Sequence, residues 1–295
     1  MPGAEDGEPL GYARSPNTGY WQPETGSDNT HIVNSNFTQS NSDYWVGCTM
    51  FFIDRHPVLQ TNTVVSAYDP ATHKITLASE ILDPQVDPDG PAVGVDCLYL
   101  YNKLELMDTA GEWACEDLGG GTWRVYVWPS DGGSPTGHTY EAARRGGYLL
   151  SWGSQSYITF DGFEVRQGTN IGIGSTSGAS GIVVQNCLVY DNGYKAMEFR
   201  NISGGAVRNC LVLSNGYGIT FGSCTDIDIE YNEIAWNRAD GLDITGTTSA
   251  NSSYITVRNN YIHDHYLWAH PDGVQTYNSD GTANIAVHDV WFDSN

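Results

Sequence analysis

The alternation of apolar and polar positions repeats along the second half of the chain. Six stretches align, and each holds a short alternating strand and a polar bend: YITFDGFEVRQ, IVVQNCLVYDN, GAVRNCLVLSN, IDIEYNEIAWN, YITVRNNYIHDH and IAVHDVWFDSN. One apolar position recurs through all six, at Phe160, Val184, Val207, Ile229, Val257 and Val287. The repeat contains no stretch of helical period, so it predicts a solenoid of β-strands rather than a helical array.

A third short strand follows in each repeat, at AMEF, GITF, GLDI and GVQT. Three strands per turn predict a right-handed parallel β-helix. The bends fall at Asn186, Asn209, Tyr231 and Asn259. Asn suits a bend because it tolerates left-handed backbone and hydrogen-bonds to a stacked neighbour. We also expect Cys187 and Cys210 to stack as free thiols in adjacent coils, and Asn232 to stack with Asn260.

Residues 1–147 lack the repeat, and they are predicted to form a β-rich module that resembles a β-sandwich. VVSAYDPATHKITLAS and EWACEDLGGGTWRVYVWP each have the pattern of a β-hairpin. Residues 148–295 are predicted to hold the coils. Residues 285–295 supply only the first strand of a coil, so we expect further coils beyond Asn295.

Charge and composition exclude several classes of function. The 295 residues include 35 acidic and only 13 basic side chains, for a formal net charge of −22. Binding to duplex nucleic acid or to an anionic membrane needs a basic surface, so neither is expected. No apolar run is long enough for a transmembrane helix. The six cysteines form no CxxC pair and no zinc-binding pattern.

The segments ARSPNTGYW, YWVGCTMFF and GEWACEDLGGGTWRVYVWP, followed by the coils, resemble a known bacterial family. This family is the pectate-lyase-like right-handed β-helix enzymes of carbohydrate breakdown, in particular glycoside hydrolases with a β-sandwich near the N-terminus. The resemblance implies a polysaccharide substrate of plant, algal or host origin. It also implies a secreted or periplasmic location, with any signal peptide absent from this chain, and we expect a monomer. The family includes hydrolases and lyases, so the resemblance leaves the reaction open.

The third strand of each coil predicts a functional face. Met197, Phe199, Leu242 and Ile244 are expected to point inward, so the residues between them face outward. This face is predicted to collect Lys195, Glu198, Arg200, Asp240, Asp243, Asp272, Gln275 and Tyr277, with Trp268 and His270 from the adjoining loop. Simpler explanations exist, because Asp240 and Asp272 precede Gly as in turns and Glu198 fits a surface ion pair.

The first hypothesis for this face is a glycoside hydrolase that uses paired carboxylates and no cofactor. Asp243 is the expected nucleophile or base and Asp272 the acid, with Glu198 as a substitute. Sugar binding is assigned to the side chains around them: Lys195, Arg200, Trp268, His270, Gln275 and Tyr277.

Two alternatives remain open from the sequence. The first is a polysaccharide lyase, with Lys195, Arg200 or His270 as base and Ca²⁺ held by Asp240, Asp243 and Asp272. The second is a non-catalytic adhesin or carbohydrate-binding protein, which needs aromatic side chains and a regular stack but no convergent acids.

Overall fold

The computed structural model describes residues 3–6, 8–53, 60–81, 90–143, 145–247, 250–266, 271–278 and 287–295. Its internal contacts divide the chain into two units, Gly3–Glu141 and Ala142–Asn295. The described residues are almost entirely strands, loops and turns, with a single short 3-10 helix, η1, at Leu104–Leu106. None of the described helices is long and apolar enough to cross a membrane. The expected all-β fold class is confirmed.

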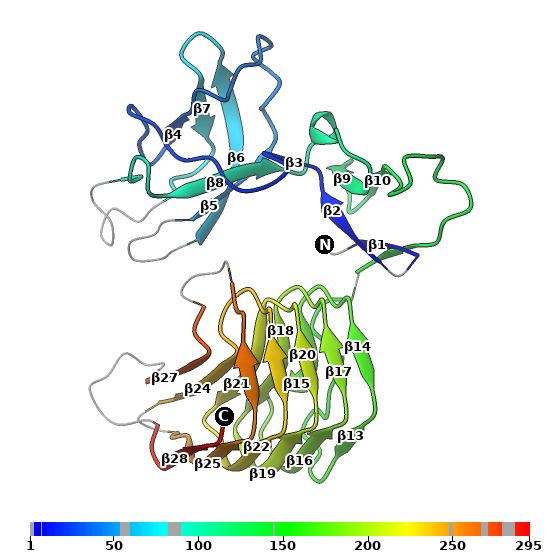
Figure 1. Cartoon of the computed structure of the whole chain (residues 1–295), viewed down its shortest axis with the longest axis vertical. Coiled ribbons are helices and arrows are strands. Elements are labelled where there is room, and N and C mark those ends of the chain that lie inside the picture. Colours follow the sequence, from blue (N-terminus) through cyan, green and yellow to red (C-terminus); the bar gives the residue numbers. More distant parts are fainter. Residues whose placement is uncertain are drawn as a thin grey trace. The chain divides into compact units, whose positions relative to one another are not determined.

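The second unit is the predicted parallel β-helix, in which the chain passes repeatedly through three stacked sheets (Figure 1). The first sheet has the order β12-β15-β18-β21-β24-β27, at Tyr148–Leu150, Ile171–Ser175, Lys195–Arg200, Tyr217–Gly222, Leu242–Gly246 and Val274–Asn278. The second has the order β13-β16-β19-β22-β25-β28, at Thr159–Asp161, Ala179–Gln185, Ile202–Arg208, Thr225–Glu230, Ser253–Arg258 and Val290–Asp293. The third has the order β14-β17-β20-β23-β26, at Glu164–Arg166, Leu188–Tyr190, Leu211–Leu213, Glu233–Ala235 and Tyr261–His263.

The predicted inward row is correct for five coils, and at the last coil Val287 packs against the core but in a different register. Strand partners connect Phe160, Val184, Val207, Ile229 and Val257 in order. Val257 then pairs with Phe292, whereas Val287 bridges Ser252. The physical reason is a hydrogen bond: this register lets the Asn295 side chain accept the backbone N–H of Asn260 at 3.0 Å.

Two columns of buried side chains hold neighbouring coils in register. In one column, the Asn215 side-chain oxygen accepts the backbone N–H of Asn192 at 3.1 Å, and Asn237 accepts that of Asn215 at 3.0 Å. In the other column Cys187 and Cys210 are at equivalent positions, because Leu188 pairs with Leu211. The side-chain oxygens of Asn232, Asn260 and Asn295 then accept, in turn, the backbone N–H groups of Cys210, Asn232 and Asn260. Each Asn supplies the partner that a buried backbone N–H at the bend requires.

The bends before these columns have the left-handed backbone that the sequence predicts. Asn186, Asn209, Tyr231 and Asn259 have φ between +52° and +55°. A second series, Asp191, Ser214, Trp236 and Asp264, has φ between +52° and +55°. A left-handed residue at equivalent points of every coil turns each strand into the next sheet, which keeps the coils superimposed.

The first unit contains two sheets. One has the order β3-β8-β5-β6-β7-β4, at Arg14–Ser15, Cys97–Tyr101, Thr49–Ile53, Gln60–Asp69, Lys74–Leu77 and His31–Val33. The other has the order β10-β9-β2-β1-β11, at Trp123–Val127, Glu112–Asp117, Glu8–Tyr12, Gly3–Glu5 and Tyr140–Ala142. Both predicted hairpins are confirmed, because β6 pairs antiparallel with β7 and β9 with β10.

The Asn column generates a stability prediction. Asn215 is fully buried and its side chain also donates to the carbonyl oxygens of Val189 and Leu213. Asn215→Ala therefore leaves several buried groups without partners and should destabilise the protein by about 3 kcal/mol. Urea unfolding followed by circular dichroism measures this. The control Asn251→Ala, at an exposed position, should change stability by less than about 0.5 kcal/mol; equal effects would contradict the role of the column.

Candidate functional site

The outer face of the first sheet carries the rows that the sequence predicts. Strand partners connect Gly174, Glu198, Thr220, Asp243 and Gln275 in one row. A second row connects Arg200, Gly222, Thr245 and Tyr277. Backbone contacts from strand to strand place Lys195, Tyr217, Asp240 and Asp272 in a third. The structure therefore brings every described candidate onto one face, while the predicted Trp268 and His270 lie outside the described residues.

Charged side chains on this face are buried although they point out of the coil. Lys195, Glu198, Asp240 and Asp243 are only 4 to 6% exposed. A buried charge is costly unless other groups neutralise it or hydrogen-bond to it. These four side chains therefore need specific partners, unlike solvated charges on an ordinary strand.

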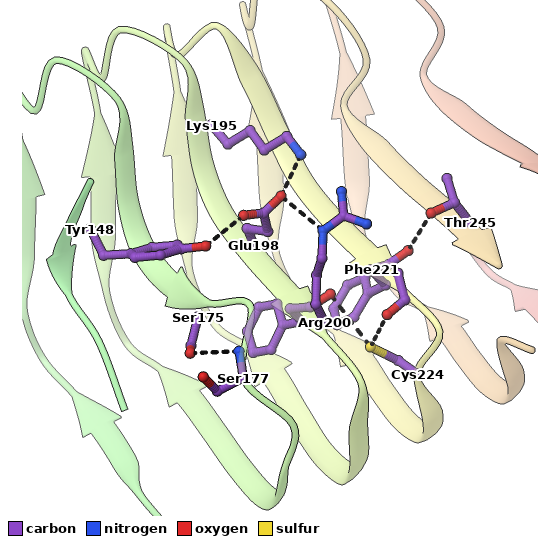
Figure 2. Close-up of polar contacts among 11 residues, drawn as sticks. Tyr148, Ser175, Ser177, Lys195, Glu198, Arg200, Phe221, Cys224 and Thr245 are labelled. Atoms are coloured by element: carbon purple, nitrogen blue, oxygen red, sulfur yellow. Dashed lines mark hydrogen bonds and ion pairs between the residues drawn. The ribbon is translucent and has the colours of Figure 1, made fainter. Parts of the chain in front are cut away.

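Glu198 has three such partners (Figure 2). The Lys195 ammonium donates to its Oε1 at 2.6 Å, and the Arg200 Nε donates to the same oxygen at 3.2 Å. The Tyr148 hydroxyl donates to Oε2 at 2.8 Å from β12, in the first coil. A Cβ at Gly174 would lie 2.9 Å from the Tyr148 ring, so a glycine there leaves room for this contact.

The partners of Glu198 fix its charge. Burial by itself would raise the pKa of Glu198, but the hydrogen bonds and charges of Lys195, Tyr148 and Arg200 outweigh burial and lower it. The carboxyl group is therefore ionised at neutral pH. In this environment Glu198 binds the side chains of Lys195 and Arg200 as a carboxylate. The environment does not favour a role as proton donor, which Glu198 would need if it replaced Asp272 as the acid.

A hydrogen bond connects the backbone of Asp272 to the side chain of Asp240. The Asp272 N–H donates to Asp240 Oδ1 at 3.0 Å, so the buried carboxylate holds the start of the next coil. Asp272 itself is exposed, and the Gln275 amide lies 3.5 Å from its Oδ2. Asp240 thus acts as a turn cap, as its Asp-Gly sequence suggests, and it positions Asp272 at the surface.

Tyrosines surround Asp243. Burial, with Tyr194, Asp240 and Asp243 adding to it, raises the pKa of Tyr217 to about 12. Burial and the Asp243 charge also raise the pKa of Tyr277. Both phenols therefore keep their protons at neutral pH and lie near Asp243 as neutral hydroxyl groups.

The three predicted metal ligands do not converge. Asp240, Asp243 and Asp272 form no group whose oxygen atoms all lie within 4.8 Å of one another. Calcium binds through several oxygens at 2.3–2.6 Å, which requires closer convergence. This geometry gives the calcium hypothesis no support, and Ca²⁺ binding here stays a prediction.

One residue of this face was missed from the sequence. Tyr148 lies in the first coil, before the aligned repeats begin, so no repeat signal identified it. The alternation does place Thr220 outward between Glu198 and Asp243; this residue is 1% exposed, and its hydroxyl finds no hydrogen-bond partner among the described residues.

The Glu198 contacts generate a second prediction. Glu198→Gln should destabilise the protein by roughly 3–5 kcal/mol at pH 7, because Lys195 then stays buried without a counter-charge. Since folding lowers the Glu198 pKa, its contribution is present above the ordinary value of about 4.3. The difference between variant and wild type should therefore shrink as the pH falls through the folded-state pKa.

Urea unfolding at pH 7 and under acidic conditions measures this difference. The matched control is Glu230→Gln, which breaks a 2.6 Å ion pair with the half-exposed Arg258 and should cost at most about 1 kcal/mol. A penalty for Glu198→Gln that does not change with pH would contradict the assignment.

Comparisons with known proteins agree with this architecture. The family model described as "Right handed beta helix region" matches residues 204–291. No curated protein shows a significant match to the chain. A solved structure titled "Glycoside hydrolase" has a TM-score of 0.51 at 12% identity, over 98% of this chain and 77% of its own.

Two phage tailspikes are similar at a lower level. One, from a Pseudomonas phage, has a TM-score of 0.33 at 11% identity, over 97% of this chain and 38% of its own. The other is from an Acinetobacter baumannii phage, in complex with a capsular saccharide. It has a TM-score of 0.23 at 8% identity, over 95% of this chain and 56% of its own. The strand order, the family model and the glycoside hydrolase fold together show that residues 142–295 form a right-handed parallel β-helix, and they confirm the expected resemblance to this family of folds.

Proposed function

We propose that the outer face of the first sheet binds a polysaccharide or oligosaccharide and hydrolyses a glycosidic bond. The observation that carries the proposal is the row of buried acidic side chains on the outside of a solenoid, where solvated residues are the norm. Burying charge in this way costs free energy, and such sites are frequently functional. The fold shared with a glycoside hydrolase is consistent with this reaction, but fold alone does not define function.

Asp243 and Asp272 are the proposed carboxylate pair. Hydrolysis needs one carboxyl group to protonate the leaving oxygen and a second to attack the sugar or activate water. Asp243 lies mid-strand beside two protonated tyrosines. Asp272 is exposed in the next coil, about 4.8 Å further along the solenoid axis. It stacks on Asp240, three residues before Asp243, so the two carboxylates are also displaced along the strand direction. Its backbone is held by Asp240, which we assign as a positioning residue.

The neighbouring side chains supply contacts for sugar hydroxyls. Gln275 follows Asp243 in its row, and Tyr277 is 46% exposed beside it. The Arg200 side chain is 39% exposed, so part of its guanidinium stays available after Nε binds Glu198. These groups form a polar surface next to the proposed pair, and a polymer lying across the strands would contact them in sequence. Such a substrate would be met outside the cytoplasm.

Hydrolysis is favoured over β-elimination by the placement of the cations. Lys195 is buried and its Nζ donates to the Glu198 carboxylate at 2.6 Å, so this side chain is directed at Glu198 and not at a substrate. Arg200 stays charged in proteins. Neither side chain is therefore suited to remove a proton from a uronate ring.

The central test is Asp243→Asn assayed on neutral and uronic polysaccharides. We expect turnover to fall about 100- to 10,000-fold, with an unchanged unfolding midpoint. New reducing ends without ultraviolet absorbance from unsaturated sugars would identify hydrolysis. The control is Asp228→Asn, an exposed mid-strand Asp in β22 of the second sheet, which should retain full activity. Full activity in Asp243→Asn would remove this residue from the site.

Asp240 permits a separate test of positioning. Asp240→Asn keeps an oxygen that accepts the Asp272 N–H, whereas Asp240→Ala removes it. We therefore expect Asp240→Asn to retain most activity and Asp240→Ala to lose at least about tenfold. Comparing kcat for the two variants measures the difference. Equal losses would indicate that the negative charge of Asp240, rather than its hydrogen bond, serves the reaction.

A further inference from the structure

We infer that the first unit contains a binding site for a divalent transition-metal ion, formed by Glu5, Asp6 and His138. Glu5 ends strand β1, Asp6 follows it, and His138 precedes β11 in the same sheet. The site is separate from the proposed carbohydrate face and does not depend on its function. Among the described residues, these three form the group whose metal-ligating atoms all lie within 4.8 Å of one another.

Two carboxylate oxygens lie close to the same ring nitrogen of His138. Nδ1 of His138 lies 2.9 Å from Glu5 Oε1 and 2.9 Å from Asp6 Oδ2. A ring nitrogen carries at most one hydrogen, and here it is hydrogen-bonded to Asp6. Glu5 is only 3% exposed, and its Oε1 receives no hydrogen bond of good geometry from the described residues, although the Tyr140 hydroxyl lies near this carboxylate. A buried carboxylate oxygen in this state requires a compensating positive charge, which either a protonated His138 or a bound metal ion supplies.

The spacing of the three atoms fits coordination. Ligands about 2.1 Å from a cation are about 3 Å apart at right angles and about 3.4 Å apart in a tetrahedral site. The two observed separations of 2.9 Å are close to the first value, and a tetrahedral ion would require each to lengthen by roughly 0.5 Å. A cation bound by His138 Nδ1, Glu5 Oε1 and Asp6 Oδ2 would form three metal–ligand bonds. These would replace the present contacts, in which both carboxylate oxygens compete for one imidazole proton.

Contacts from neighbouring residues already orient each of the three ligands. The Ser130 N–H donates to Glu5 Oε2 at 2.8 Å, and the Thr139 N–H donates to Asp6 Oδ1 at 2.8 Å. Nε2 of His138 faces Asp131 Oδ2 at 3.6 Å. In the two carboxylates the oxygen that would not bind metal is held by a hydrogen bond, and in His138 the second nitrogen lies within ion-pair distance of Asp131, which leaves the ligating atoms directed at the cluster. Such supporting contacts are typical of metal sites.

The donor set selects the class of ion. One imidazole nitrogen and two carboxylate oxygens suit Zn²⁺ or Mn²⁺, whereas Ca²⁺ prefers oxygen ligands alone. Zn²⁺ binds more tightly than Mn²⁺ at such sites. Because the ligands come from opposite ends of the first unit's sequence, metal binding would tie its N-terminal strand to the segment before β11 and stabilise that unit.

The test uses the full chain, stripped of metal with a chelator and titrated with ZnCl₂ or CaCl₂ by calorimetry and thermal unfolding. We expect one equivalent of Zn²⁺ to bind and to raise the Tm, with no shift for Ca²⁺. His138→Gln and Glu5→Gln should abolish both effects. The matched control is His31→Gln, which removes another His–Asp pair of the same unit, at 3.0 Å, and should bind Zn²⁺ like the wild type.

The outcomes that overturn the inference are equally definite. These are no stoichiometric Zn²⁺ binding by the wild type, or equal binding by His138→Gln and His31→Gln. If the site variants do not fold by circular dichroism, Co²⁺ added to the wild type decides. Weak visible bands indicate nitrogen and oxygen ligands and support the site. A strong near-ultraviolet thiolate band indicates binding to cysteine and overturns it.

Discussion

The register between neighbouring coils is the constraint on which the other features depend. Parallel strands stack about 4.8 Å apart, and a slip of one residue would turn every outward side chain inward. Buried Asn side chains prevent such a slip: the Asn215 side chain accepts a backbone N–H from the preceding coil and donates to carbonyl oxygens of that coil and of its own. Left-handed residues at equivalent bends keep the coil path constant. Residues more than 20 positions apart in sequence are thereby fixed as neighbours on one face.

The same register produces different outer faces on different sheets. On the second sheet, the outward row Asp161, Gln185, Arg208, Glu230, Arg258 and Asp293 consists of exposed or half-buried side chains that pair along the stack. On the first sheet, four outward charged side chains are nearly inaccessible: Lys195, Glu198, Asp240 and Asp243. Glu198 also binds Lys195 and the partly exposed Arg200 through one oxygen. A row of outward charged residues can thus be a series of solvated surface ion pairs or an ordered polar site. The exposed fraction of the side chains distinguishes the two.

Much of the fold followed from periodicity, because each coil contributes the same pattern of inward residues. The error at Val287 arose because two segments near the C-terminus, IAV and VWF, fit the apolar alternation of the last coil equally well. In the structure VWF pairs with β25, and the Asn295 side chain bonds to Asn260 in this register. The sequence also predicted which residues share the outer face. It did not predict the burial of Lys195 and Glu198, nor the reach of Tyr148 from the first coil, because both depend on packing between coils. Alternation shows which way a side chain points and not how deeply it is covered.

The most direct test of the account is a crystal structure of the Asp243→Asn variant with a bound oligosaccharide substrate. The account predicts a sugar chain lying across β18, β21, β24 and β27, with its glycosidic oxygen between residue 243 and Asp272 and with contacts to Arg200 and Gln275. An oligosaccharide bound on the second or third sheet, with the first sheet empty, would contradict it.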